Sequence, residues 1–146
     1  MTYDNFTVNA QEAILAGQRL AATLNQQTVD TTHLLKGILE ANEDSAKFLF
    51  QKAGVSIPQL VKALDEAIQS YPKVSASDKQ YLTDHSNKAL AEAKKFLAEF
   101  GDEFISTEIM LLGIMRGSRK GAQILKNQGE TFDALKGAMK KLGAGR

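Results

Sequence analysis

The sequence predicts an all-α fold, a pseudo-twofold bundle of two four-helix repeats, on two observations. The first is an internal repeat, in which the apolar and turn-forming residues of positions 6–41 recur at positions 82–117, so that Thr7 corresponds to Thr83. Because most surface residues differ between the copies, the repeat indicates a duplicated packing unit. The second is the spacing of apolar residues, which follows the period of an α-helix in both copies and indicates no convincing strand.

We expect one domain over residues 1–146, because each half is too small to bury its apolar faces alone. Repeat one spans 6–70 and repeat two spans 82–142. The segment between them, 71–81, has a turn-forming composition and is expected to be a linker within the domain. Residues 143–146, Gly-Ala-Gly-Arg, are expected to form a flexible exit.

The first helix of repeat one is expected to begin at Thr7, whose hydroxyl can cap the opening turn, and Thr83 recurs at the matching place. Small residues recur within the apolar stripes at Gly17 and Ala93, which predicts a close helix–helix crossing there. The stripes are Ala13, Ile14, Gly17, Leu20, Ala21 and Leu24 in repeat one, and Ala89, Leu90, Ala93, Phe96, Leu97 and Phe100 in repeat two.

Capping residues and glycines predict the boundaries of the other helices. The second helices are expected to begin at Thr31 or Thr32 and at Ser106 or Thr107. The third helices should end before Gly54 and Gly129. The fourth helices should be capped by Ser56 and Thr131.

The composition excludes several classes of protein. A net charge of +1 gives no electrostatic case for binding nucleic acid or a membrane surface, and the basic residues from Arg116 to Lys141 are spaced as on a solvated helix face. The absence of cysteine excludes disulfides, thiol catalysis and cysteine-based zinc sites. No apolar run is long enough to cross a bilayer and no secretory signal is present, so a cytoplasmic protein is expected.

Catalytic signatures are mostly missing. The two histidines, His33 and His85, do not occupy matching positions, and both fall at helix starts, where His33 is expected to be partly exposed or to cap its helix. Asp102, Glu103 and Glu108 form a carboxylate cluster, but their spacing matches no calcium loop, and the helix dipole favours carboxylates early in a helix. We therefore predict no catalytic residue, no metal site and no cofactor.

Two further features bear on function. The segment 117–121 is rich in glycine and cations but lacks the spacing of a phosphate-binding loop, so it is expected to be a loop matching 42–45. Phe104 corresponds to Thr28 in repeat one. A residue required only for packing should recur, so Phe104 either forms a one-sided surface feature or fills a gap between the halves.

Several motifs together resemble those of the Clp N-terminal domain family. Residues 6–7, an alanine-rich helix and then 29–39 (VDTTHLLKGIL) resemble one half of that domain, and 100–108 (FGDEFISTE) resembles the other. The resemblance covers residues 3–142. Within the family the chain is most similar to ClpB, the AAA+ disaggregase, because of its Gly-Asp-x-Phe-Ile-Ser run and the Tyr-Pro-Lys-Val linker at 71–74.

The resemblance implies the eight-helix fold of that family and a role without catalysis. The domain would be a mobile appendage of a hexameric, ATP-driven chaperone whose AAA+ modules lie in the same parent chain. Its partners would be unfolded or aggregated polypeptides, whose exposed apolar segments it engages and passes to the central pore. The isolated domain would be a monomer, and neither nucleic acid nor a membrane is an expected partner.

The resemblance also implies the residues of a substrate-binding site. Three polar positions carry over individually, and the apolar groove of the family corresponds to two positions with a third adjacent. The difference between the repeats, and not the resemblance, adds the residue at position 104. These positions are Thr7, Asp102 and Glu108, then Phe96, Ile109 and Met110, and finally Phe104. The polar residues have an alternative interpretation as helix caps, and the apolar ones as core. One departure from the family is Glu92, at a groove position that is often apolar.

Three other functions remain open. ClpC- or ClpA-type domains receive adaptor proteins or phosphorylated arginine and usually carry a threonine–glutamate pair in both halves. Here Thr83 is matched by Glu108 but Thr7 by Thr32, so a symmetric pair of sites is not expected. A small hydrolase would need the carboxylate cluster to converge in a closed pocket. A structural spacer would show no surface groove.

Overall fold

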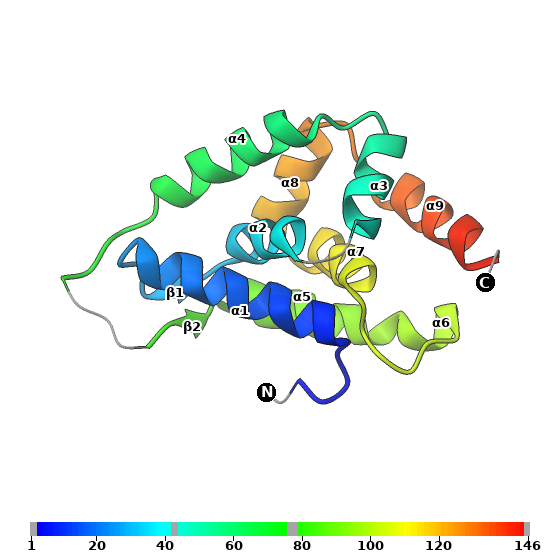
Figure 1. The fold of residues 1–146 in the computed structure, drawn as a ribbon, viewed down its shortest axis with the longest axis horizontal. Coiled ribbons are helices and arrows are strands. Elements are labelled where there is room, and N and C mark those ends of the chain that lie inside the picture. The colour runs from blue at the N-terminus through cyan, green and yellow to red at the C-terminus, as the bar shows by residue number, and fades with distance from the viewer. Residues whose placement is uncertain (1–2, 42–43, 76–78, 145–146) are drawn as a thin grey trace.

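The computed structural model describes residues 3–41, 44–75 and 79–144. In these segments the chain forms nine helices and two strands of two residues each, which confirms the predicted all-α class (Figure 1). Repeat one contains α1 (Val8–Thr23), β1 (Thr28–Val29), α2 (Thr31–Glu40), α3 (Ser45–Lys52) and α4 (Ile57–Gln69). Repeat two contains β2 (Tyr81–Leu82), α5 (Asp84–Lys95), α6 (Leu97–Phe100), α7 (Thr107–Gly117), α8 (Arg119–Asn127) and α9 (Phe132–Ala144).

Helices α2 and α7 form the centre of the bundle. Nearly every residue of both helices is buried, as expected of a helix that is covered on all sides. In Figure 1, α1 and α5 lie on one side of this pair, and α3, α4, α8 and α9 lie on the other. The packing follows the sequence repeat, because α1 packs on α2 as α5 packs on α7.

Small residues permit these two crossings. A Cβ atom on Gly17 would lie 2.9 Å from the carbonyl oxygen of His33, and Ala93 contacts the matching helix of repeat two, so the predicted close crossing is confirmed. The approach is closer still at the central helices, where a Cβ on Gly37 would lie 1.9 Å from a backbone oxygen of α1 and one on Gly113 2.2 Å from a backbone oxygen of α5. Backbone thus packs directly on backbone in both repeats.

The two repeats are joined by backbone pairing across the pseudo-twofold axis. β1 pairs with β2 in a parallel register that places Val29 beside Leu82. Their counterparts in the other copies, Ile105 and Phe6, form an isolated parallel bridge. The segment that precedes the first helix of each repeat therefore pairs with the other repeat. The sequence analysis missed these strands because two residues show no period.

The predicted caps are confirmed. Thr7 Oγ1 accepts a hydrogen bond from the backbone N–H of Ala10 at 3.1 Å, and Ser56 and Thr131 cap α4 and α9 in the same way. The glycines that follow the third helices take up left-handed conformations, with φ of 83° and 103°. These glycines are Gly54 and Gly129. The second helices begin at Thr31 and Thr107, within the expected ranges.

The structure differs from the expected helices at two places. The single helix expected up to Phe100 is interrupted at Phe96, where a turn separates α5 from α6, and Gly101 ends α6 with φ of 67°. The predicted loop at 117–121 is a short junction, because α8 begins at Arg119. Its expected counterpart at 42–43 lies outside the described residues, as do part of the linker, 76–78, and the last residues of the predicted exit, 145–146, whereas α9 continues to residue 144.

His33 is completely buried, so the expectation of partial exposure was wrong, although its capping role is confirmed. Its Nδ1 atom accepts a hydrogen bond from the backbone N–H of Asp30 at 2.9 Å, which closes the first turn of α2. Its Nε2 lies 2.7 Å from the side-chain oxygen of Gln26, whose amide nitrogen donates to the carbonyl of Ile68. The imidazole thus ties α2 to the end of α4, which a short sequence pattern does not reveal.

Candidate functional site

One surface hollow brings together three of the predicted site residues. It has a volume of about 500 Å³ and lies between the α6–α7 loop, the first turn of α7 and the last turns of α9. We call it the α6–α9 groove. Its lining residues are Glu99, Phe100, Gly101, Asp102, Ser106, Glu108, Ile109, Met139, Lys140 and Leu142.

Asp102 lies in the groove because of the turn that ends α6. Gly101 is left-handed, and the backbone N–H of Asp102 returns to the carbonyl of Leu97 at 3.0 Å. Asp102 does not cap the next helix, since Ser106 Oγ accepts the hydrogen bond from the backbone N–H of Ile109 at 3.2 Å. The alternative interpretation of Asp102 as the cap of α7 was therefore wrong.

Glu108 is buried, with 7% of its surface exposed, and its carboxylate joins the two repeats. Oε1 accepts hydrogen bonds from the hydroxyl of Thr107 at 2.7 Å and from the hydroxyl of Ser45, the first residue of α3, at 3.0 Å. These two bonds satisfy a charge that would otherwise be costly to bury. One edge of the groove is thereby fixed to repeat one.

The remaining apolar candidates are mostly buried. Met110 is completely buried, Ile109 is 1% exposed, and Phe96 is 5% exposed. Ile109 contributes to the wall of the groove, whereas Phe96 lies outside it and packs against Phe132 of α9 with ring centroids 5.7 Å apart. Phe104 is 49% exposed, so it is a surface feature and does not fill a gap between the halves.

Thr7 lies beside the chain segment that leads into α7. Its backbone N–H donates to the carbonyl of Ile105 at 2.9 Å, and its hydroxyl caps α1. Neither Thr7 nor Glu92 lines the groove. Glu92 forms an ion pair with Lys95, three residues later on α5, at 3.1 Å.

The rim of the groove carries paired charges. Glu99 forms ion pairs with Lys136 and Lys140 of α9, at 2.5 Å and 2.9 Å. Hydrogen bonds from these two ammonium groups hold the pKa of the exposed Glu99 carboxyl below its usual value. α9 is thus held against α6, and two apolar residues of α9, Met139 and Leu142, complete the groove. The two residues are three positions apart and can share a helical face, but nothing in the sequence places that face opposite Asp102.

The threonine of the threonine–glutamate pattern in repeat two contacts residues of repeat one. Thr83 Oγ1 donates to Asp30 Oδ1 at 2.9 Å, and the other oxygen of Asp30 accepts from the hydroxyl of Tyr71 at 2.9 Å. Thr32 in turn lies 2.8 Å from that tyrosine hydroxyl. Because the segment before each repeat crosses to the other repeat, Thr83 meets residues of repeat one.

The carboxylate cluster does not converge. Glu103 is exposed and is absent from the groove lining, while Asp102 and Glu108 both line it. Among the residues that the structure describes, no group of three or more histidine, aspartate or glutamate side chains is placed to hold a metal ion. Nor does any helix in the described segments combine the length and apolarity needed to cross a bilayer.

Known proteins are similar to this chain over nearly its whole length. It is 35% identical over 145 residues to the chaperone protein ClpB of Bacteroides thetaiotaomicron. The matched region covers 99% of this chain and 17% of that protein. It is 34% identical over 143 residues to the chloroplastic chaperone protein ClpB2 of Oryza sativa subsp. japonica, covering 97% and 15% respectively. The chain therefore spans only a small part of the length of these relatives.

Solved structures share the fold. The N-terminal domain of Hsp104 from Candida albicans superposes with a TM-score of 0.79 at 19% identity, covering 91% of this chain and 87% of that one. The N-terminal domain of ClpD from Arabidopsis thaliana gives a TM-score of 0.74 at 22% identity, covering 97% of each chain. Residues 5–128 match the family model of the Clp repeat N-terminal domain. The chain therefore belongs to the Clp repeat N-terminal domain family, as its two ordered motifs predicted.

Proposed function

We propose that this chain is a non-catalytic binding module for apolar segments of unfolded polypeptides, and that the α6–α9 groove is its binding site. The observation that carries the proposal is the convergence of Asp102, Glu108 and Ile109 with Met139 and Leu142 in one hollow. Apolar side chains of a client would contact the walls, while the polar residues would bond its backbone amides.

Exposed apolar side chains near the groove support this proposal. Leu142 is 40% exposed, Phe104 is 49% exposed, and Phe48 of α3 is 45% exposed. Figure 1 shows α3, α6 and α9 gathered at the same end of the molecule. Large exposed apolar side chains that gather at one place are typical of interaction sites.

The groove supports weak and unselective binding. Its volume of about 500 Å³ holds a few side chains at once. A disordered client also loses conformational entropy when it binds, which lowers affinity for a given contact area. Weak binding would suit a domain that passes its client to another part of the same machine.

The role in a longer protein is likewise part of the proposal. The curated relatives that match this chain are named ClpB chaperones. By that relationship the domain would serve a hexameric, ATP-driven disaggregase, with the AAA+ modules in the same parent chain, and the isolated domain would be monomeric. The adaptor- or phosphoarginine-binding alternative has less support, because Thr32 is hydrogen-bonded to Tyr71 and repeat one has no glutamate at that position.

The test is an amide chemical-shift titration of the domain with a permanently unfolded, apolar polypeptide, with the same protein in its folded state as the control. Shift changes should be confined to the α6–α7 loop, the first turn of α7 and the end of α9. Unchanged spectra at high client concentration would refute client binding and bring the adaptor alternative forward.

A pair of variants sharpens this test. Leu142→Ser should weaken client binding about fivefold, because a leucine that is 40% exposed can bury roughly 1 kcal/mol of further apolar surface. Leu15→Ser, on α1 and outside the groove, removes a leucine of similar exposure, 44%, and should leave affinity unchanged. Equal losses in the two variants would show that the groove is not the site.

A further inference from the structure

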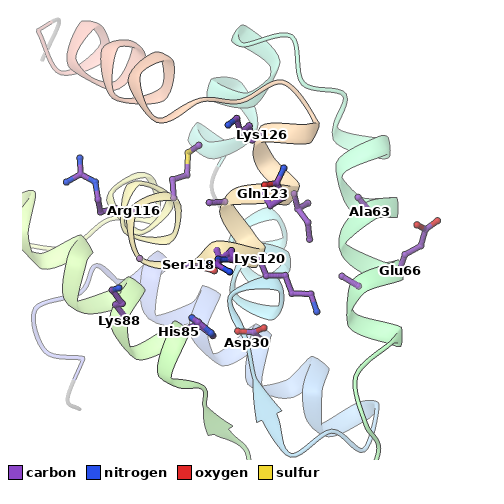
Figure 2. Close-up of a pocket in the computed structure, with 16 residues that line it drawn as sticks. Asp30, Ala63, Glu66, His85, Lys88, Arg116, Ser118, Lys120, Gln123 and Lys126 are labelled. Carbon is purple, nitrogen blue, oxygen red and sulfur yellow. The ribbon is translucent and has the colours of Figure 1, made fainter.

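A second and larger hollow lies at the seam between the repeats. It has a volume of about 1390 Å³ and is bounded by α4, α5 and the α7–α8 junction (Figure 2). It shares no residue with the α6–α9 groove. We call it the basic cleft, because most of its charged lining residues are cations. These cations are Lys88, Arg116, Arg119, Lys120 and Lys126.

The cations of the basic cleft form no ion pair with any residue that the structure describes. The ion pairs of the described segments use other cations, such as Lys36 with Asp65 and Lys136 with Glu99. Arg116 is directed away from the centre of the cleft, over the ring of Phe132 at 4.4 Å. The other four remain exposed around the hollow, so the cleft has a local excess of positive charge in a chain whose net charge is only +1.

The two carboxylates that line the cleft, Asp30 and Glu66, offset only part of the charge of its five cations. Asp30 already accepts hydrogen bonds from the hydroxyls of Tyr71 and Thr83. Glu66 of α4 points away from the other lining residues in Figure 2. A ligand in the cleft would therefore meet mainly ammonium and guanidinium groups.

The floor of the cleft is apolar. Ala63 and Ala67 of α4 and Ala122 of α8 line it, and Met115 and Ile124 add larger apolar side chains. Small residues on two neighbouring helices leave room for another chain to lie between the charged rims. A purely ionic ligand would leave this floor uncovered.

We propose that the basic cleft docks an acidic polypeptide segment whose carboxylates alternate with apolar side chains. The carboxylates would pair with Lys88, Arg119, Lys120 and Lys126, while the apolar side chains would cover the alanine-lined floor. A nucleic acid fits less well, because no phenylalanine or tyrosine side chain lines the cleft to stack on a base. The cleft would thus recognise a partner different in charge from the apolar clients of the other site.

The test uses fluorescence anisotropy with a labelled peptide in which glutamates alternate with leucines and alanines. The domain should bind this peptide and bind its glutamine-for-glutamate counterpart much more weakly, and binding should weaken as salt is added. Amide shift changes should fall on α4, α8 and the start of α5. The absence of binding, or shifts confined to the α6–α9 groove, would refute the proposal.

Charge-reversal variants separate a specific cleft from general attraction. The double variant Lys88→Glu with Lys126→Glu changes two exposed residues whose side chains form no ion pair with any residue that the structure describes. It should weaken binding of the peptide about tenfold. Lys94→Glu with Lys141→Glu gives the same net charge from exposed lysines outside the cleft, and should have little effect. Equal weakening by both pairs would overturn the proposal.

Two further arms identify the partner class. A single-stranded oligonucleotide should bind more weakly than the acidic peptide, and tighter oligonucleotide binding lost in the cleft variant would show a nucleic-acid surface instead. Binding of the apolar client should be unaffected by the cleft variant and should be weakened by Leu142→Ser. The two proposed sites can therefore fail independently of each other.

Discussion

Acidification is expected to destabilise this domain through His33. The imidazole is completely buried, and its Nδ1 accepts a hydrogen bond from the backbone N–H of Asp30 at 2.9 Å. A proton on Nδ1 would replace this acceptor with a second donor that faces the N–H group. Burial lowers the pKa of His33 from 6.5 to about 4, and the neighbouring charge of Asp30 opposes this effect only in part.

The magnitude follows from proton linkage. The unfolded chain takes up a proton on this histidine near pH 6.5, whereas the folded protein takes it up only near pH 4. The contribution to the free energy of unfolding is therefore complete above pH 6.5 and is lost as the pH falls toward 4. The loss reaches about 2 kcal/mol at pH 5 and levels off at about 3 kcal/mol. That is a large part of a typical domain stability of about 5–15 kcal/mol.

The assay is urea denaturation of the wild type and two variants between about pH 7 and pH 5. His85→Gln changes an exposed histidine and should retain the full loss, whereas His33→Gln should lose stability at neutral pH and show a shallower pH dependence. Carboxylates titrate in all three proteins, so the differences between them isolate the histidine. An NMR titration of the folded domain that finds the His33 imidazole protonating near pH 6.5 would refute this reasoning.

The structure makes two further predictions about stability, both measurable by urea denaturation. Gly113→Ala should lower the free energy of unfolding by about 2 kcal/mol, because the new Cβ would lie 2.2 Å from a backbone oxygen of α5. Gly137→Ala, in open space on α9, should instead raise it by up to about 1 kcal/mol. Similar effects at both glycines would contradict this account of the crossing. Glu108→Ala should cost about 2 kcal/mol by leaving the hydroxyls of Thr107 and Ser45 without this acceptor, and Glu108→Gln, which keeps an acceptor oxygen, should cost less. Equal costs for the two Glu108 variants would show that hydrogen bonding to the hydroxyls is not the cause.

Features that depend on neighbouring residues in the sequence were predicted correctly. Thr7 and Ser56 cap their helices through contacts three residues away, and Gly54 takes up the left-handed conformation that its place after a helix requires. The repeat also predicted a close crossing, since the small residues Gly17 and Ala93 occupy matching positions. Such features need no knowledge of which helix lies beside which.

Features that join distant parts of the chain were missed. His33 is buried because Gln26 and the end of α4 enclose it, and that contact spans a separation of 42 residues between Gln26 and Ile68. Leu142 joins the groove only because α9 turns back beside α6. The cations of the basic cleft, among them Lys88 and Lys126, are spaced in the sequence like those of an ordinary solvated helix face, and only the arrangement of three helices brings them around one hollow.

The groove in repeat two has no open equivalent at the matching residues of repeat one, and the chain itself is the reason. Gln26 corresponds to Asp102 and Thr32 corresponds to Glu108, but both repeat-one residues are completely buried. Gln26 bonds the last turn of α4, and Thr32 bonds Tyr71 of the linker that joins the repeats. The end of α4 and the linker that joins the repeats therefore cover, in repeat one, the place that corresponds to the α6–α9 groove of repeat two.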